Sequence, residues 1–387
     1  MPVYLRMVEA KTGYRIAVNA RMLLPDYLEG IGNFTNECLK RIVAAHPEHE
    51  FLFIFDRPFD PRFIYGPNVK GIVCGPPARH PLLWKLWYDL KLPLLLKKWK
   101  ADLFLSPDGF ASLKTQIPQC LVIHDLAFIH YPGFQKRSHR YFFQRYTKRY
   151  ISKVQTIATV SGFSRKDIID HFPEAKNKLA IVYSGVKPGF MALDPSRKEA
   201  IKQKFTGGNE YFLYTGAIHP RKNLINLLKA FSLFKKRQRS SMKLVLTGRL
   251  AWKYDGFLQD LRHYKYRDEV VLTGYVEEQE LTEITAAAYA MVYPSLHEGF
   301  GVPVLEAMRS GVPAITSQHS SMQEIAGDAA LYADPSEPSS IAEQMMRIYK
   351  DEILREKLVE KGYLVSEEFT WERTAGLLWE TMVKALP

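Results

Sequence analysis

The sequence predicts an α/β fold with two doubly wound domains that face each other across a deep cleft. Three observations support this prediction. The 387 residues exceed the size at which a single hydrophobic core stops growing. Short apolar, β-rich runs alternate with longer amphipathic segments, as in parallel sheets covered by helices on both faces. The alternation restarts after the turn-rich stretch 184–189, which divides the chain into two similar halves.

The expected strands occur in both halves of the chain. They cover 15–20, 50–56, 71–74, 102–106, 120–124, 156–160 and 179–183 in the first half, and 211–216, 243–247, 270–273, 290–293, 313–316 and 330–332 in the second. We therefore expect an N-terminal domain at 1–187 and a C-terminal domain at 188–365. The remaining segment, 366–387, is expected to form a helix that packs back on the N-terminal domain. Ligands of doubly wound sheets bind at the carboxyl ends of the strands, here in the cleft.

Composition excludes several classes of protein. Apolar residues make up 47% and charged residues 24% of the chain, which is an ordinary globular balance. No apolar run is long enough to span a bilayer, and residues 1–14 lack the features of a signal peptide. Cys38, Cys74 and Cys120 are odd in number and far apart, which predicts neither disulfides nor a zinc site. These observations indicate a protein of the cytoplasm.

The net charge of +12 favours anionic partners. Charge alone leaves phosphates, nucleic acid and an acidic membrane surface open. Because no nucleic-acid-binding module is recognisable, we expect no nucleic-acid partner. The nearest approach to a dinucleotide fingerprint is Gly30-Ile31-Gly32, with Thr35 where the third glycine would stand, so we expect no cofactor. No D-x-D sequence, a pair of aspartates that can hold a metal ion, occurs in the chain, so we expect no metal.

The most informative segment is 295–308, SLHEGFGVPVLEAM, which follows a strand and opens a helix. Its glycines allow the backbone to approach a ligand, and amides at a helix start favour an anion. Glu298 in the loop and Glu306, expected in the first helical turn, are two carboxylates for different ends of one ligand. The alternative is an ordinary loop followed by a glutamate that favours the helix dipole.

A second segment, 214–224 (YTGAIHPRKNL), again combines a strand, a turn and the start of a helix. Arg221 and Lys222 are expected in the first helical turn, where the helix dipole disfavours cations. An anion such as a diphosphate would offset that cost, with arginine as a forked donor and lysine as a point charge. A solvated basic turn is the alternative. The helix should bury one face, formed by Leu224, Leu228, Phe231 and Phe234.

Together these segments resemble the retaining GT-B glycosyltransferases of the large E-x7-E family, that is, glycosyltransferase family 4 and glycosyl transferases group 1. The resemblance extends over residues 15–385 and implies two Rossmann-like domains. It also implies metal-independent transfer of a hexosyl unit of the mannose, glucose or N-acetylglucosamine class. The donor would be a nucleotide diphosphate-sugar, and the acceptor a glycan or a lipid-linked acceptor in polysaccharide or glycoconjugate synthesis.

The resemblance also assigns roles to residues. Glu298, His124, Arg221 and Lys222 are the expected catalytic residues, with Glu298 on the transferred sugar and Glu306 on the ribose. For His124 the alternative is a histidine satisfied by backbone at a strand end. The expected donor-binding residues are Gly30 and Gly32 of a glycine loop, Gly216, Arg221, Lys222, Tyr275 and Val276 beside the nucleobase, Glu298, Gly299, Phe300, Gly301, Val302 and Glu306.

Other functions remain open on the residues alone. An epimerase or a phosphorylase can share this architecture, and a non-catalytic nucleotide-sugar-binding protein can share the motifs. No lysine-centred cofactor motif favours a phosphorylase. Release of nucleotide only in the presence of an acceptor would distinguish transfer from these alternatives.

Segment 80–100 mixes Trp, Leu and Lys in a way that suits an anionic membrane surface or a lipid-linked acceptor. It predicts peripheral contact with the inner face of the membrane. In the alternative interpretation, Leu83, Leu86, Leu90 and Leu94 belong to the core and the lysines form a solvated face.

Overall fold

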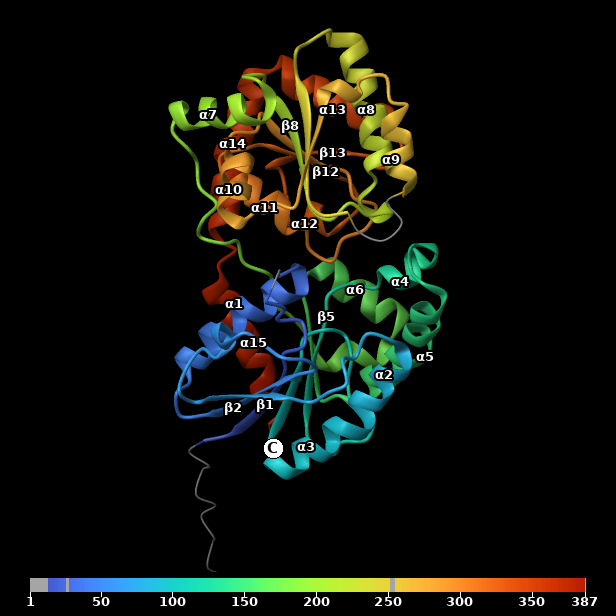
Figure 1. Cartoon of the computed structure of the whole chain (residues 1–387), viewed down its shortest axis with the longest axis vertical. Coiled ribbons are helices and arrows are strands. Elements are labelled where there is room, and N and C mark those ends of the chain that lie inside the picture. Colours follow the sequence, from blue (N-terminus) through green and yellow to red (C-terminus); the bar gives the residue numbers. More distant parts are fainter. Residues whose placement is uncertain (1–12, 26–27, 251–254, 387) are drawn as a thin grey trace, which may run out of the picture.

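The computed structural model describes residues 13–25, 28–250 and 255–386. It has two α/β lobes stacked along the long axis of the molecule (Figure 1). The lower lobe contains the first half of the chain and the upper lobe the second half, while the last helix returns to the lower lobe. The prediction of two doubly wound α/β domains is confirmed.

The N-terminal sheet has seven parallel strands in the order β3-β2-β1-β4-β5-β6-β7. In its centre Val18 lies opposite Phe53 on one side and Leu105 on the other. The strands are β1 (Arg15–Asn19), β2 (Glu50–Phe55), β3 (Val69–Val73), β4 (Leu103–Ser106), β5 (Gln119–Ile123), β6 (Thr156–Thr159) and β7 (Leu179–Ile181). The helices are α1 (Gly30–Ala45), α2 (Pro81–Leu86), α3 (Leu92–Trp99), α4 (Ala127–His130), α5 (Arg137–Lys153) and α6 (Gly162–His171).

The C-terminal sheet has six parallel strands in the order β10-β9-β8-β11-β12-β13. They are β8 (Tyr211–Thr215), β9 (Lys243–Thr247), β10 (Val270–Gly274), β11 (Ala290–Tyr293), β12 (Ala314–Ser317) and β13 (Ala330–Ala333). The helices are α7 (Pro195–Thr206), α8 (Leu224–Gln238), α9 (Asp255–Arg262), α10 (Glu278–Ala286), α11 (Val302–Arg309), α12 (Ser321–Ala326), α13 (Pro338–Lys350) and α14 (Glu352–Glu367). The last helix, α15 (Trp371–Val383), belongs to the N-terminal lobe. Every strand expected from the sequence corresponds to one of the observed strands.

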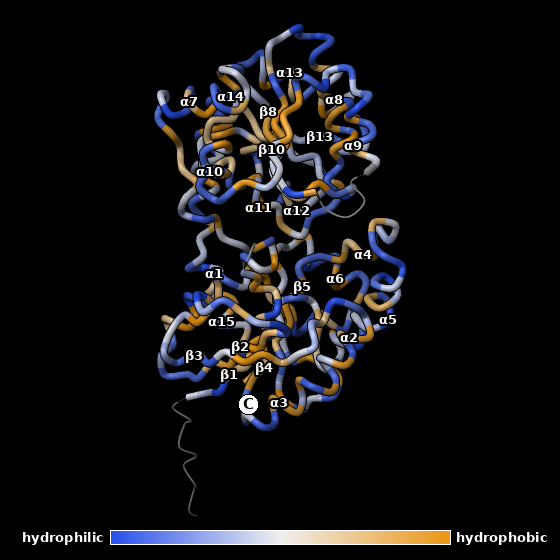
Figure 2. Tube along the Cα trace, in the orientation of Figure 1, coloured by the Kyte–Doolittle hydropathy of each residue, from blue (hydrophilic) through white to orange (hydrophobic). Residues whose placement is uncertain are grey.

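Each sheet is buried on both faces, and the hydrophobic stretches of the chain gather along the strands in the middle of each lobe (Figure 2). Helix α8 covers the C-terminal sheet with the face that the sequence predicts. Leu224, Leu228, Phe231 and Phe234 are all at most 4% exposed. Because the apolar residues recur at helical spacing, burial of this face fixes the rotation of α8 about its own axis.

The carboxyl ends of the two sheets face each other across the domain boundary. Asp125 follows β5 in one domain, and Arg221 follows β8 in the other; the two side chains are hydrogen-bonded. In both sheets the chain order reverses beside a central strand, β1 or β8, which is the place where ligands of this architecture bind.

The chain passes between the domains twice, and the two crossings touch. The amide of Val186 donates to the carbonyl of Phe369 at 2.9 Å. A Cβ on Gly185 would lie 2.5 Å from the backbone nitrogen of Trp371, so only glycine fits between the crossings. Helix α15 then packs against α1, where Arg41 pairs with Glu372 at 2.8 Å. No helix within the described ranges is long and apolar enough to cross a membrane.

Candidate active site

Two cations and two carboxylates meet where the carboxyl ends of the sheets face each other. Lys222 Nζ lies 2.5 Å from Glu298 Oε1, and Arg221 Nη1 lies 3.0 Å from Asp125 Oδ2. Arg221 Nη1 is also 3.9 Å from Glu298 Oε2. Three of these residues come from the C-terminal domain and Asp125 from the N-terminal domain, so this charge cluster bridges the boundary.

A short 3₁₀ turn, Pro220–Lys222, carries the two cations. The ring of His219 accepts a hydrogen bond from the Arg221 amide at 3.2 Å. Asn223 follows in the left-handed conformation with φ of 64° and donates to the carbonyl of Pro294 at 3.0 Å. Helix α8 begins only after it. The prediction that Arg221 and Lys222 lie in the first turn of the helix is therefore wrong, because the reversal at Asn223 separates them from α8 and directs them to the domain boundary.

Glu298 is buried, with 7% of its surface exposed, and is held from three sides. Its Oε1 accepts hydrogen bonds from Ser295 Oγ at 2.5 Å, Tyr293 Oη at 3.2 Å and Lys222 Nζ at 2.5 Å. Burial by itself raises the pKa of Glu298, but the charges of Lys222 and Arg221 outweigh it and lower the pKa. The carboxylate is thus ionised and fixed in place.

Burial lowers the pKa of Lys222, and the charge of Glu298 offsets only part of that effect. For Arg221, burial opposes the charged form, but Glu298 and Asp125 together raise its pKa. The cluster is therefore two ion pairs whose charges balance. A buried cation of this kind needs an anion beside it, whether from the protein or from a ligand.

The glycines after Glu298 allow the two domains to touch. A Cβ on Gly299 would lie 2.1 Å from the carbonyl oxygen of His124, and Ser161 Oγ donates to the carbonyl of Gly299 at 2.7 Å. Gly301, with φ of 105°, caps α11, and a Cβ there would meet Met322. Phe300 between them is buried, and Val302 begins α11. The backbone at these glycines thus approaches other parts of the protein closely, where the sequence predicted a close approach to a ligand.

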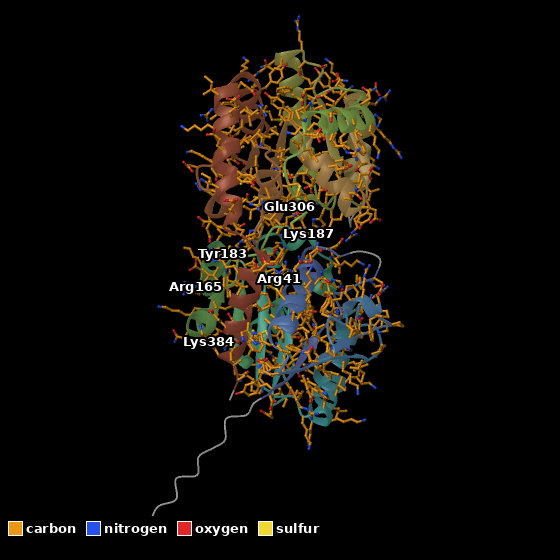
Figure 3. The ribbon with its side chains drawn as sticks, turned by 90° about the vertical axis from the view of Figure 1, so that its left-hand side faces the viewer. Arg41, Arg165, Tyr183, Lys187, Glu306 and Lys384 are labelled. Carbon is orange, nitrogen blue, oxygen red and sulfur yellow. The ribbon has the colours of Figure 1, made fainter. Side chains whose placement is uncertain are left out.

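Glu306 lies in the second turn of α11, not in the first as predicted, because the helix begins at Val302. Figure 3 shows it beside Lys187 at the junction of the domains. Lys187 Nζ is 2.5 Å from Glu278 Oε2. Burial raises the pKa of Glu306 to about 7; Lys187 lowers it in part and Glu278 adds to the rise.

His124 follows β5, and its Nε2 lies 3.0 Å from the carbonyl oxygen of Pro107. The ring meets Phe34 edge-on at 5.1 Å. Burial lowers the pKa of His124, which favours the neutral ring. One ring nitrogen is thus satisfied by backbone, as in the alternative interpretation of this residue, while its carbonyl contacts Gly299.

The other predicted donor-binding residues lie at the start of α1 and at the ends of β8 and β10. Gly30 and Gly32 lie in the first turn of α1 and not in a loop, while their contact with the donor stays a prediction; a Cβ on Gly32 would meet the carbonyl oxygen of Met22 at 2.7 Å. Gly216 directly follows β8, with φ of 131°. Tyr275, which is 56% exposed, and the partly buried Val276 follow β10 at the edge of the sheet.

Sequence reasoning missed several residues of the site. Tyr293 and Ser295, which hold Glu298, come from the end of β11 and the loop after it. The family resemblance implies that the pair His124-Asp125 lies near the transferred sugar, but it does not predict the ion pair between Asp125 and Arg221. Glu278, which pairs with Lys187 near Glu306, had no motif around it. The available signal was position, since polar residues at the carboxyl ends of parallel strands gather at one edge.

Comparisons with known proteins match both halves of the chain to glycosyltransferases. Residues 196–365 match the family model "Glycosyl transferases group 1", and residues 29–190 match "Glycosyltransferase Family 4". The chain is 27% identical to the O-antigen chain mannosyltransferase B of Escherichia coli, with 89% of this chain and 93% of the relative covered. It is also 27% identical to the O-antigen chain mannosyltransferase RfbU of Salmonella typhimurium, with coverage of 71% and 72%.

Two solved structures have the same fold. The sucrose-phosphate synthase of Thermosynechococcus elongatus superposes with a TM-score of 0.78 at 18% identity, covering 96% of this chain and 99% of that one. Anabaena Alr3699/HepE in complex with UDP and glucose superposes with a TM-score of 0.74 at 15% identity, with coverage of 96% and 99%.

The raised pKa of Glu306 predicts a pH-dependent cost to stability. Ionisation is harder in the folded state than in the unfolded chain, so the stability contribution of Glu306 is complete below its ordinary pKa of 4.5 and falls until the pH passes about 7. Glu306→Gln should therefore gain stability relative to the unmodified protein across this range, by at most about 3 kcal/mol. Thermal unfolding at pH 5, 6, 7 and 8 measures the difference.

The matched control is Glu343→Gln on α13, which removes a negative charge from an exposed position. A difference between Glu306→Gln and the unmodified protein that is the same at pH 5 and pH 8 would contradict the prediction.

Proposed function

Because the chain belongs to the GT-B glycosyltransferases of family 4, with a C-terminal half of the glycosyl transferases group 1, we propose that it transfers a mannosyl unit from a nucleotide diphosphate-sugar to a glycan or lipid-linked acceptor. The choice of mannose rests on the O-antigen mannosyltransferases among its relatives. We further propose that transfer retains the anomeric configuration and needs no metal, and that the enzyme works at the inner face of the cytoplasmic membrane.

The observation that carries this proposal is the charge cluster at the domain boundary. Arg221 and Lys222 are balanced in the free protein by Asp125 and Glu298. A donor diphosphate would take over the two cations, because it offers more negative charge in the same place. In the transition state the leaving diphosphate gains further charge, and preorganised cations stabilise it there.

Retention follows if the acceptor hydroxyl attacks from the face that the diphosphate leaves. The new bond joins the acceptor oxygen to the anomeric carbon as the bond from that carbon to the diphosphate oxygen breaks. The acceptor proton then passes to the departing diphosphate. Glu298, already fixed by Ser295 and Tyr293, would hold the hydroxyls of the transferred sugar during this step.

A panel of nucleotide sugars tests the donor. A donor that binds the folded state stabilises it by mass action, so thermal shifts with GDP-mannose, UDP-glucose and UDP-N-acetylglucosamine rank the candidates. A shift only with the glucose or N-acetylglucosamine donor would overturn the choice of mannose. Release of nucleotide without any acceptor would favour one of the other enzyme classes of this architecture.

If Arg221 and Lys222 replace a metal, transfer should survive EDTA. Lys222→Ala should slow transfer by about 100-fold, as expected when one donor to a developing anion is lost. Lys229→Ala, an exposed lysine on α8, is the matched control and should leave the rate unchanged. Loss of activity in EDTA that only Mg²⁺ or Mn²⁺ restores would contradict the proposal.

Replacement of Glu298 and replacement of Glu306 should have different effects on nucleotide affinity and on turnover. If Glu298 holds the sugar, Glu298→Gln should lower turnover roughly tenfold to 150-fold while affinity for the bare nucleoside diphosphate persists. Glu306→Gln should weaken the bare nucleotide as well, because the ribose is common to both ligands. Calorimetric titration and initial rates distinguish the two variants. A larger loss of nucleotide affinity in Glu298→Gln would reverse the assignment.

Membrane contact is proposed for the surface formed by α2, α3 and the π-helical turn between them, Trp87–Lys91. Leu82, Leu90 and Leu94 are 75%, 57% and 69% exposed. The alternative interpretation, which assigns Leu90 and Leu94 to the core, is therefore wrong for these two residues. The exposed lysines of this surface are Lys91, Lys97, Lys98 and Lys100. Exposed leucines beside lysines suit an anionic bilayer, where the apolar chains insert and the ammonium groups meet headgroups.

This surface should bind anionic vesicles more strongly than neutral ones at low salt. A double replacement of Leu90 and Leu94 by Ser should lower retention at least about tenfold, because two exposed side chains lose their apolar contact. Leu364→Ser, at 68% exposure on α14, is the control and should leave retention unchanged. Equal sedimentation with anionic and neutral vesicles would overturn the proposal.

A further inference from the structure

Three metal-ligating side chains from both domains converge beside the charge cluster. His130 ends α4 and Asp167 lies on α6, both in the N-terminal domain, while His297 immediately precedes Glu298 in the C-terminal domain. One ligand atom from each of the three lies within 4.8 Å of those of the other two. His130 Nε2 is 2.8 and 2.9 Å from the two carboxylate oxygens of Asp167. The ring centroids of His130 and His297 are 4.9 Å apart.

The three side chains line a pocket of about 320 Å³. His297 is 6% exposed, whereas the side chain of His130 is 35% exposed, so the group is buried on one side and accessible on the other. His171 Nδ1, one turn along α6, lies 3.1 Å from Asp167 Oδ1. Such an outer partner orients a carboxylate for a metal, as the residues around established metal sites do.

Two imidazoles and one carboxylate are a ligand set typical of Zn²⁺, with water in the fourth position. We propose that a divalent transition metal, Zn²⁺ as the probe, binds His130, Asp167 and His297 and ties the two domains together at the mouth of the cleft. Metal bonds of about 2.0–2.2 Å draw the ligand atoms closer than they lie here, and the exposed His130 side chain has room to rotate.

The bridge would act on the adjacent charge cluster. The carbonyl of His297 accepts a hydrogen bond from Arg221 at 3.1 Å, and the next residue, Glu298, pairs with Lys222. A metal that joins His297 to the N-terminal domain would favour the state in which Asp125 and Glu298 are paired with Arg221 and Lys222. In that state the two cations are not free to bind the donor diphosphate. A ligand shifts an equilibrium toward the state that it binds better, so the metal slows donor entry. This effect on rate rests on the proposed function, whereas metal binding does not.

A second group of ligands provides the control. His46, Glu48 and His49 also lie close enough to hold a metal, with His46 Nδ1 3.2 Å from Glu48 Oε1. All three come from the connection between α1 and β2 in the N-terminal domain. A metal there would not touch the C-terminal domain. Among the described residues these are the two such groups, and only the first spans the boundary.

The first experiment is a Zn²⁺ titration of metal-free protein against a chromophoric chelator. In the His46→Ala background one Zn²⁺ should still bind, and adding His130→Ala should weaken it at least tenfold. His46→Ala protein that binds no Zn²⁺, or a double variant that binds as tightly as His46→Ala, would overturn the site.

The second experiment tests the bridge by hydrogen exchange. Zn²⁺ should slow exchange in 162–171 and 294–301 together in the His46→Ala protein, and should leave both unchanged once His130→Ala is added. Protection of 162–171 alone would overturn the bridge. Zn²⁺ should also slow transfer in the unmodified protein, and His130→Ala should remove this inhibition. Metal binding and protection in a protein without transferase activity would overturn the proposed function and leave the metal site standing.

Discussion

The arrangement of the two domains depends on the charge cluster, in which the ion pair between Arg221 and Asp125 crosses the domain boundary. Arg221 and Lys222 are largely withdrawn from water, with 23% and 13% of their side chains exposed, and Asp125 and Glu298 are the carboxylates that compensate them. An unpaired charge in such a place is costly, so either the domains close on each other or a ligand supplies the negative charge. Domain arrangement and ligand binding are therefore two solutions to one electrostatic requirement. This coupling explains why the cluster uses residues from both domains.

A second polar contact crosses the boundary and can exchange partners easily. Glu324 of the C-terminal domain accepts hydrogen bonds from the amides of Gly162 and Phe163 at the start of α6, at 2.7 and 2.6 Å. It also accepts from Tyr183 Oη at 3.0 Å. A carboxylate at a helix start is favourable, yet water or an anion can take its place at modest cost. Contacts of this type hold two domains in register without preventing them from separating.

The fold could be predicted from the sequence because its signals are local. Runs such as LVL at 244–246 are apolar throughout and flanked by polar residues, which suffices to predict a buried parallel strand. The grouping of Arg221, Lys222 and Glu298 was also accessible, since all three follow strands of one sheet. The errors concern details of backbone and partner. Helix α11 begins at Val302, which places Glu306 in the second turn and not in the first. Helix α1 begins at Gly30, where the two glycines suggested a loop.

What the sequence could not predict depends on contacts between residues far apart in the chain. Asp125 and Arg221 are 96 residues apart, and their pairing exists only once both sheets have formed and docked. The same holds for His130 and His297, which share no motif. Exposure of Leu90 and Leu94 was equally undecided, because helical spacing alone does not say which face meets the core.

The double crossing of the chain has a consequence for synthesis. Helix α15 packs on α1, but it leaves the ribosome only after the whole C-terminal domain has emerged. The first domain therefore waits, with the apolar surface that α15 covers still open to solvent, while its neighbour is translated and folds. During this interval the nascent chain is a substrate for chaperones and is prone to aggregate. Completion of the first domain thus comes after synthesis of the second.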